Sequence, residues 1–179
     1  NSNGNLMWSS IHSGGSGIDR GRHIHVAANG NVYVSGQANN GTNEDAIIIK
    51  YNSNGAEQWT YTFDNNHENF RQSILSSDES ITLLANVSDE ADSLSTKIAI
   101  TQVNNSGQVL WEQLYTQPSG LPVFAEHIAA SSSGEFVIVG SMANAPGPNY
   151  EYDCLTLKYN ASGAFQWAVP FNAPSNSDD

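Results

Sequence analysis

The chain has 179 residues, enough for one ordinary domain or for a few units of a repeat array. Its formal net charge of −12, with only six lysine and arginine residues, argues against nucleic acid or an anionic membrane surface as a partner, because clustered basic side chains bind both. A single cysteine, Cys154, excludes an intrachain disulfide, and no apolar run approaches the ~20 residues that membrane insertion of a helix requires.

Surface composition and sequence repetition both point to a repeat protein. Charged residues make up only 13% of the chain, and asparagine, serine, glycine and threonine are abundant, which is common in secreted repeat proteins. One phrase occurs four times, as NSNGNLMW, NSNGAEQW, NNSGQVLW and NASGAFQW, and ends at Trp8, Trp59, Trp111 and Trp167. The unit therefore repeats about every 50 residues, a period that suits a propeller blade of four strands.

The first predicted element is an extra tryptophan-bearing strand at residues 5–12. Three complete units follow, at roughly residues 14–63, 64–115 and 116–171. The first half of each unit predicts a β-hairpin, as in HIHVAANGNVYVSG, because a polar turn separates an apolar segment from a β-branched or aromatic one.

The second half of each unit predicts another hairpin, as in DAIIIKYNSNGAEQWTYTF. Gly55, Gly107 and Gly163 lie where its tight turn requires a positive φ, which glycine adopts without steric cost. Each unit is thus expected to be an antiparallel meander of four strands. Some strands, such as Phe136-Val137-Ile138-Val139, are apolar on both faces, so we expect sheets that are covered on both sides.

The predicted fold class is all-β, with three complete four-stranded antiparallel propeller blades and one extra strand. Closed propellers use ~4–8 blades, so three blades leave the outer faces of the first and last sheets bare. These outer faces are expected to include Val32, Val34, Leu155 and Leu157 or their opposite-face neighbours. The expected partners are therefore other propeller blades, from the same longer chain or from copies of this one.

The motifs resemble a known family. WSSIHSGGSGIDRGRHIHVAANGNVYVSG followed by DAIIIKYNSNGAEQW is similar to the bacterial seven-bladed-type (SBBP) β-propeller repeat. The middle unit departs from this pattern, with Lys97 where Asp45 and Asp153 stand and SDESITLLA in place of GNVYVSG. The resemblance implies a propeller in a secreted or cell-surface bacterial protein, and it supplies no catalytic residues. A weaker likeness to quinoprotein propellers rests on the Gly-x-x-x-Trp step alone.

The four tryptophans could form a stacking platform for sugars, but their repetition favours an aromatic wedge between blades. The charge pairs Asp19 with Arg22 and Glu68 with Arg71 occur at matching places and are interpreted as structural bridges. Cys154 aligns with Ala46, which predicts a buried small side chain. No recognisable motif brings a nucleophile together with a general base, so the chain is not expected to be an enzyme and no cofactor is expected.

Calcium is the metal for which the sequence offers the best candidate ligands. Asp89, Glu90 and Asp92 place three carboxylates within four residues of a loop, which can supply the oxygen ligands that Ca²⁺ prefers. They do not follow the spaced pattern of a dedicated calcium loop, so a solvated acidic loop is the alternative.

Strand direction indicates where a ligand would bind. The connections between the second and third strands and between units are long and differ from unit to unit, and variable loops on a rigid scaffold commonly carry binding. The predicted binding face at this end contains Phe70, Phe124, Tyr150 and Tyr152. Three hypotheses follow: a non-catalytic scaffold or interaction module, a glycan- or calcium-binding module, and the propeller portion of a larger secreted enzyme.

Overall fold

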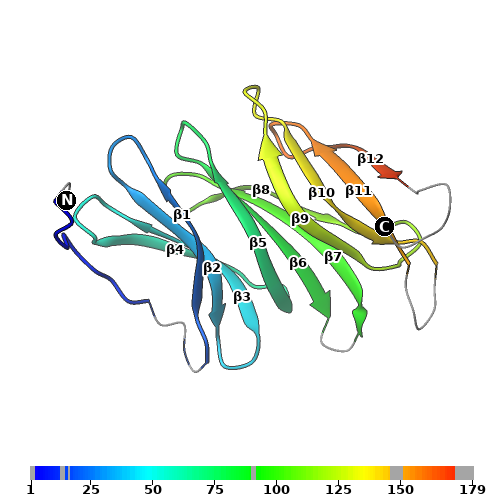
Figure 1. Cartoon of the computed structure of the whole chain (residues 1–179), viewed down its shortest axis with the longest axis horizontal. Helices are drawn as coiled ribbons and strands as arrows, with labels where there is room; N and C mark the ends of the chain where they lie inside the picture. The colour runs from blue at the N-terminus through cyan, green and yellow to red at the C-terminus, as the bar shows by residue number, and fades with distance from the viewer. Residues whose placement is uncertain (1–2, 13–14, 16, 90–91, 146–150, 172–179) are drawn as a thin grey trace.

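A computed structural model describes residues 3–12, 15, 17–89, 92–145 and 151–171. These residues form three four-stranded antiparallel sheets and no helix, so the prediction of an all-β chain with three four-stranded units is confirmed (Figure 1). The described residues therefore contain no helix that is long and apolar enough to cross a membrane. We call each sheet a blade.

Strands follow chain order within every blade, so each blade is a simple meander. Blade 1 contains β1 (Arg20–Val26), β2 (Val32–Asn39), β3 (Glu44–Tyr51) and β4 (Glu57–Phe63). Blade 2 contains β5 (His67–Leu75), β6 (Ile81–Asp89), β7 (Asp92–Val103) and β8 (Val109–Tyr115). Blade 3 contains β9 (Val123–Ala130), β10 (Phe136–Ala143), β11 (Tyr152–Tyr159) and β12 (Phe165–Phe171).

The turn between the third and fourth strands is the same in all three blades. An asparagine opens it, and its side-chain oxygen accepts hydrogen bonds from the backbone N–H groups two and four residues later, at 2.8–3.1 Å. The glycine three residues after the asparagine has a φ of 82°, 83° or 77°, as the sequence predicts for Gly55, Gly107 and Gly163. This local pattern explains why the repeated Asn-x-x-Gly phrase forms a hairpin.

The blades lie side by side in an open row, with blade 1 and blade 3 at its two ends (Figure 1). One apolar core fills the space between blades 1 and 2 and contains Tyr33, Ile48, Phe63, Ile81 and Leu83. A second core lies between blades 2 and 3 and contains Ile98, Ile100, Phe136, Ile138 and Leu157. The interior strands are therefore covered on both faces, which is why they are apolar on both.

The first strand of each blade carries a bulge against the second strand. The extra residue is Arg22 in β1, Arg71 in β5 and Glu126 in β9. The first strands also contact one another, β1 with β5 and β5 with β9. The bulges therefore place three charged side chains at equivalent positions along the first strands.

The expected extra strand at residues 5–12 is not formed, so this prediction is wrong for the described structure. The segment has no strand pairing and lies against blade 1, where Trp8 packs on the apolar residues of β2 and β3. A fourth strand forms only when the third strand of its own blade offers a hydrogen-bonding edge. No such strand lies beside residues 5–12 in the described part of the chain.

The outer face of blade 3 also differs from one expectation. Leu155 and Leu157 are buried against blade 2, and the opposite-face neighbour Cys154 is the exposed residue. The prediction that Cys154 is buried is therefore wrong. Cys154 does occupy the position of Ala46, which blade 2 covers, but no blade covers this face of blade 3 in the described chain.

Truncating Trp111 to alanine tests the packing between blades 2 and 3. Trp111 lies against the second core and packs edge-on against Phe136, with 5.6 Å between ring centroids. We expect the substitution to lower the free energy of unfolding by about 3 kcal/mol in urea titrations. Trp167→Ala is the matched control and should cost less than about 1 kcal/mol, because that ring is 41% exposed. Equal losses for the two variants would contradict a core role for Trp111.

Candidate functional site: the flanks of the blade row

Each of the first three tryptophans covers a glycine in the blade that follows it. A Cβ atom at Gly55 would overlap the Trp8 ring, one at Gly163 would overlap Trp111, and one at Gly107 would come within 3.0 Å of Trp59. The positive φ and this close approach both require glycine. We call this repeated contact the Trp–Gly interlock. Trp59 and Trp111 thus lie between two blades, the role that the repetition predicted for all four tryptophans.

Polar contacts hold the interlock in register. The indole Nε1 of Trp59 donates a hydrogen bond to the carbonyl of Asn105, 3.0 Å away in the glycine turn of blade 2. Lys50 Nζ donates to the same carbonyl at 2.9 Å. Trp59 is therefore fixed on the turn of blade 2 by both its ring face and its N–H group, whereas the Trp111 N–H donates to Gln102 of its own blade at 3.0 Å.

Trp167 is the one tryptophan without a glycine turn beyond it in the described chain. It lies on an exposed face of blade 3, which we call the C-terminal flank: Val139, Tyr152, Cys154, Trp167, Val169 and Phe171. Phe171 is 67% exposed, whereas Phe63, at the same position of blade 1, is 3% exposed. Ser35 and Ala46 correspond to Val139 and Cys154 and are fully buried by blade 2.

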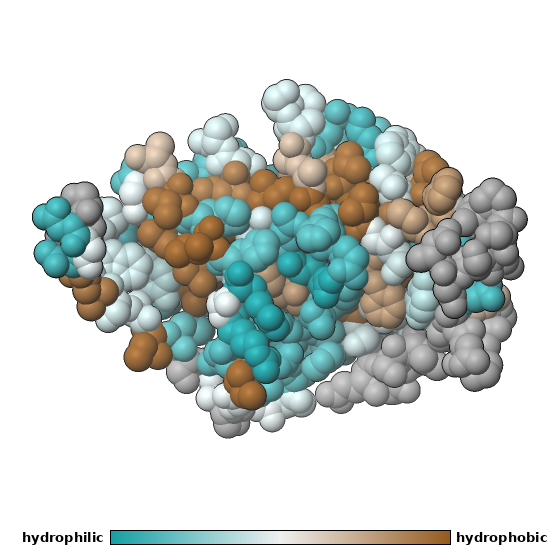
Figure 2. Space-filling view, viewed as in Figure 1, coloured by the Kyte–Doolittle hydropathy of each residue, from teal (hydrophilic) through white to brown (hydrophobic). Residues whose placement is uncertain are grey.

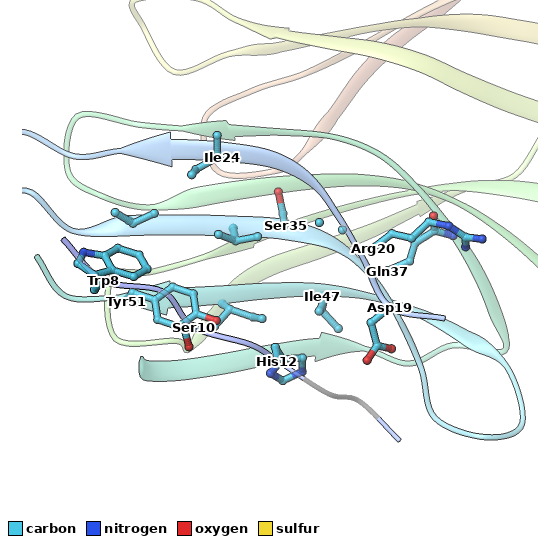
Figure 3. Close-up of a pocket in the computed structure, with 15 residues that line it drawn as sticks. Trp8, Ser10, His12, Asp19, Arg20, Ile24, Ser35, Gln37, Ile47 and Tyr51 are labelled. Atoms are coloured by element: carbon cyan, nitrogen blue, oxygen red, sulfur yellow. The ribbon is translucent and has the colours of Figure 1, made fainter. Parts of the chain in front are cut away.

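The opposite face of blade 1 is the N-terminal flank, formed by Ile24, Val32, Val34, Ile47, Ile49 and Tyr51. Residues 3–12 cross it and leave a cavity of about 310 Å³. Figure 3 shows Trp8 beside Tyr51 at one end of this cavity and Arg20 with Gln37 at the other. The equivalents of Val32 and Val34 in blade 2, Ile81 and Leu83, are fully buried by blade 1.

Figure 2 shows how the apolar surface is distributed on one face of the molecule. Hydrophobic side chains gather in a band and in separate patches around a polar central area. Exposed apolar surface of this extent marks an interaction site in a soluble protein. The C-terminal flank exposes Val139, Trp167, Val169 and Phe171, and we take the two flanks as the candidate functional site.

Hydrogen bonds between first strands recur at both junctions. The backbone N–H of Ser73 donates to His23 Nδ1 at 3.4 Å, and that of Ile128 donates to Gln72 Oε1 at 2.9 Å. His23 and Gln72 occupy the same position in their blades, and His127 is the third member of the series. The series therefore ends at the C-terminal flank on a histidine without a following blade in the described chain.

The charge pairs differ from those expected within each unit. Asp19 accepts a hydrogen bond from the Asn39 backbone at 2.9 Å, and Arg22 donates to Gln37 at 3.4 Å. Arg71 forms an ion pair with Glu126, which joins the bulges of blades 2 and 3. The predicted pairing of Glu68 with Arg71 is therefore wrong, and the ion pair that bridges blades 2 and 3 is Arg71 with Glu126.

Sequence reasoning missed Glu79. It stands in the hairpin turn of blade 2, where blades 1 and 3 have glycine, and it has a φ of 63°. Its carboxylate accepts hydrogen bonds from blade 1, at 2.5 Å from Asn29, 3.1 Å from Asn31 and 2.7 Å from Tyr33. The hydrogen bonds from Tyr33 and Asn31 lower the pKa of Glu79 below its usual value. The replacement of glycine in one of three equivalent turns was the signal that could have found it.

Two buried carboxyl groups lie near the junction of blades 1 and 2. Glu68 accepts a hydrogen bond from the Asn65 backbone at 2.7 Å, but its second oxygen has no partner, and the same is true of Asp45 Oδ1. Burial raises the pKa of Glu68 to about 7, and the nearby carboxylates of Asp45 and Asp64 act in the same direction. Burial also raises the pKa of Asp45.

The residues predicted to form a binding face do not form one surface. Phe70 is buried in the core between blades 1 and 2, edge-on to His23, so its assignment to an exposed face is wrong. Phe124 contacts Tyr152, with 5.9 Å between ring centroids, and both belong to the open side of blade 3. Tyr150 lies outside the described residues.

Phe124 also lines a groove of about 260 Å³ at the junction of blades 2 and 3. The rest of its lining is polar or charged and comprises His67, Asn69, Arg71, Asn86, Ser88, Thr96 and Glu126. One aromatic ring beside amide, hydroxyl and charged groups suits a small polar ligand.

The calcium prediction falls outside what the structure describes. Glu90 is not among the described residues, and neither are the side chains of Asp89 and Asp92. Within the described part of the chain, no three His, Cys, Asp or Glu residues group so as to hold a metal ion. Calcium binding by this acidic loop therefore stays a prediction.

Gly163→Ala separates the two demands that the interlock makes on glycine. The substitution adds strain at a φ of 77° and also collides with Trp111. Gly120→Ala is the matched control, because Gly120 has a φ of 76° and nothing within 4 Å of its Cβ position. We expect Gly163→Ala to cost about 2 kcal/mol more than Gly120→Ala in urea unfolding. In the Trp111→Ala background this excess should disappear, and its persistence would show that the contact is unimportant.

Glu68→Gln tests the buried carboxyl group. A pKa near 7 in the folded chain, above the ordinary 4.5, means that folding favours the protonated form. The stabilisation is complete below pH 4.5 and is lost as the pH rises to 7, so stability should fall by about 3 kcal/mol over this interval. The glutamine variant should lack this contribution and be the more stable protein at pH 8. Parallel pH profiles for parent and variant, from thermal melts, would refute the assignment.

Comparisons with known proteins assign no family. A scan against protein-family models finds no match, and a search of curated proteins finds no matching relative.

Proposed function

We propose that this chain is a β-propeller blade array that serves as a non-catalytic scaffold or interaction module. Its blades join further blades through the two flanks, and contacts with other ligands are made at the end that carries the long connections. The resemblance of GNVYVSG and DAIIIKYNSNG to the SBBP repeat supports a secreted or cell-surface bacterial protein.

The observation that carries this proposal is the state of Trp167. Trp8, Trp59 and Trp111 each cover a glycine turn, whereas Trp167 is 41% exposed on an apolar flank. Covering about 100 Å² of apolar surface is worth about 2.5 kcal/mol, so an apolar face of several side chains gains much by docking. A surface that is buried at two equivalent places in the same molecule is shaped for a blade at the third.

A second candidate function is glycan binding in the groove that Phe124 lines. The groove combines an aromatic ring with the side chains of Asn69, Asn86 and Arg71, which suit the apolar and hydroxyl faces of a sugar. Asn86 is itself engaged, since it donates to the Ala125 carbonyl at 3.2 Å and accepts from its N–H at 2.7 Å. Binding there would use Phe124 and the rim, with Asn86 fixing the wall.

Sedimentation velocity tests blade joining. We expect the chain to associate as its concentration rises, and Trp167→Ala to weaken this association at least tenfold, because it removes the ring that would enter the next glycine turn. Leu110→Ala is the control, since Leu110 is a similarly exposed apolar residue outside the C-terminal flank. A monomer at every concentration, or equal weakening by both substitutions, would contradict the proposal.

A further inference from the structure

The glycine turn of blade 1 is occupied by a residue that belongs to no strand. Trp59 and Trp111 reach their turns from β4 and β8, but Trp8 reaches Gly55 from residues 3–12, which pair with no strand. All residues of the segment except Trp8 and His12 are exposed. Leu6 and Ile11 are 82% and 96% exposed, and the contact between His12 Nδ1 and Glu57 is 3.9 Å long. Few buried contacts make a segment easy to detach.

The two flanks are the two halves of one interface. The C-terminal flank presents the residues that each blade places against the following blade, and the N-terminal flank presents those that each blade places against the preceding one. Blade 3 of one copy therefore fits blade 1 of a second copy as blade 1 fits blade 2. Because the halves lie at opposite ends of the row, they meet between copies in a head-to-tail arrangement.

The polar groups of the two flanks also match. Lys158 is the equivalent of Lys50, so in this arrangement its Nζ meets the Ser53 carbonyl of the second copy as Lys50 meets Asn105. At the bulges, Glu126 of one copy comes next to Arg22 of the other, in the same relation that pairs Arg71 with Glu126. The junction between copies thus brings opposite charges together at the bulge position.

We propose that residues 3–12 are a displaceable placeholder for a second copy of this chain. In the free chain Trp8 fills the Gly55 turn; on head-to-tail docking, Trp167 of one copy takes that turn and Trp8 leaves. The proposal rests on the proposed function, blade joining, and adds its partner and its regulation. Only the fraction of chains with the turn open can dock, so the placeholder lowers the apparent affinity by that fraction.

Trp8→Ala tests the placeholder. The substitution opens the Gly55 turn, so we expect the dissociation constant from sedimentation to fall about tenfold or more below that of the parent. Cys154 supplies a second readout. It is exposed on the C-terminal flank and is the only cysteine, and its equivalent Ala46 is fully buried. Its labelling by a thiol reagent should slow with rising concentration, and do so at lower concentration in Trp8→Ala.

A peptide control does not depend on the stability of the variant. The peptide NGNLMWSSIH, which carries residues 3–12, should dissociate assembled Trp8→Ala and restore Cys154 labelling, whereas the same peptide with alanine for tryptophan should not. The double variant Trp8→Ala, Trp167→Ala should remain monomeric, because neither ring can enter the turn.

The outcomes separate the two proposals. Equal association of parent and Trp8→Ala, or weaker association of a folded Trp8→Ala, would overturn the placeholder and leave blade joining intact. The same follows if the peptide fails to compete. Monomeric parent and monomeric Trp8→Ala, both with Cys154 labelling independent of concentration, would overturn joining between copies and the placeholder together.

Discussion

The packing of an indole ring on a left-handed glycine organises the molecule. The turn needs glycine for its positive φ, and the ring needs glycine because a side chain there would occupy its place. One glycine therefore satisfies a constraint from its own hairpin and another from the preceding blade. Since the tryptophan of each repeated phrase is used by the next unit, the repeat couples neighbouring blades as well as folding each one. A blade of this kind is stabilised mainly by its neighbours.

Local chemistry predicted much of this fold, because the turns are specified within a few residues. Asn52 and Gly55 define a hairpin whatever surrounds them, and the same holds for the corresponding turns of the other blades. The sequence of a strand does not specify which neighbouring blade covers each of its faces. Strands that are apolar on both sides carry no sign of which side meets the next blade, which is why the sequence left the outer face of blade 3 open between Leu155 and its opposite-face neighbours. Cys154 was expected to be buried like Ala46, but no blade covers it in the described chain. Phe70 was misplaced for a different reason: it was assigned to the end with the long connections, but β5 already begins at His67 and holds Phe70 in the sheet.

The replacement of a turn glycine by Glu79 was visible in the sequence, but the polar partners at the junction of blades 1 and 2 could not be named because they come from another blade. The carboxylate of Glu79 meets Asn29, Asn31 and Tyr33, about 50 residues away, and no spacing rule links such positions. Its donors also offset a backbone conformation that costs a side-chain-bearing residue about 1 kcal/mol. Glu68 is similar, since only the packed structure shows that its second oxygen is buried without a partner.

The two junctions share their apolar contact and one hydrogen bond between first strands, but they differ in their other polar contacts, so the sequence also specifies the order of the blades. Between blades 1 and 2, the hydroxyl oxygens of Ser35 and Ser73 lie 2.6 Å apart, and Glu79 accepts hydrogen bonds from side chains of blade 1. If blade 3 followed blade 1 directly, Ser35 would lie against Ile128. The donors Asn29, Asn31 and Tyr33 would then face Gly134, which has no side chain to accept their hydrogen bonds. Buried polar groups would be left unsatisfied. Units with nearly interchangeable tryptophans are thereby kept from pairing out of sequence while the chain folds, a characteristic hazard of repeat proteins.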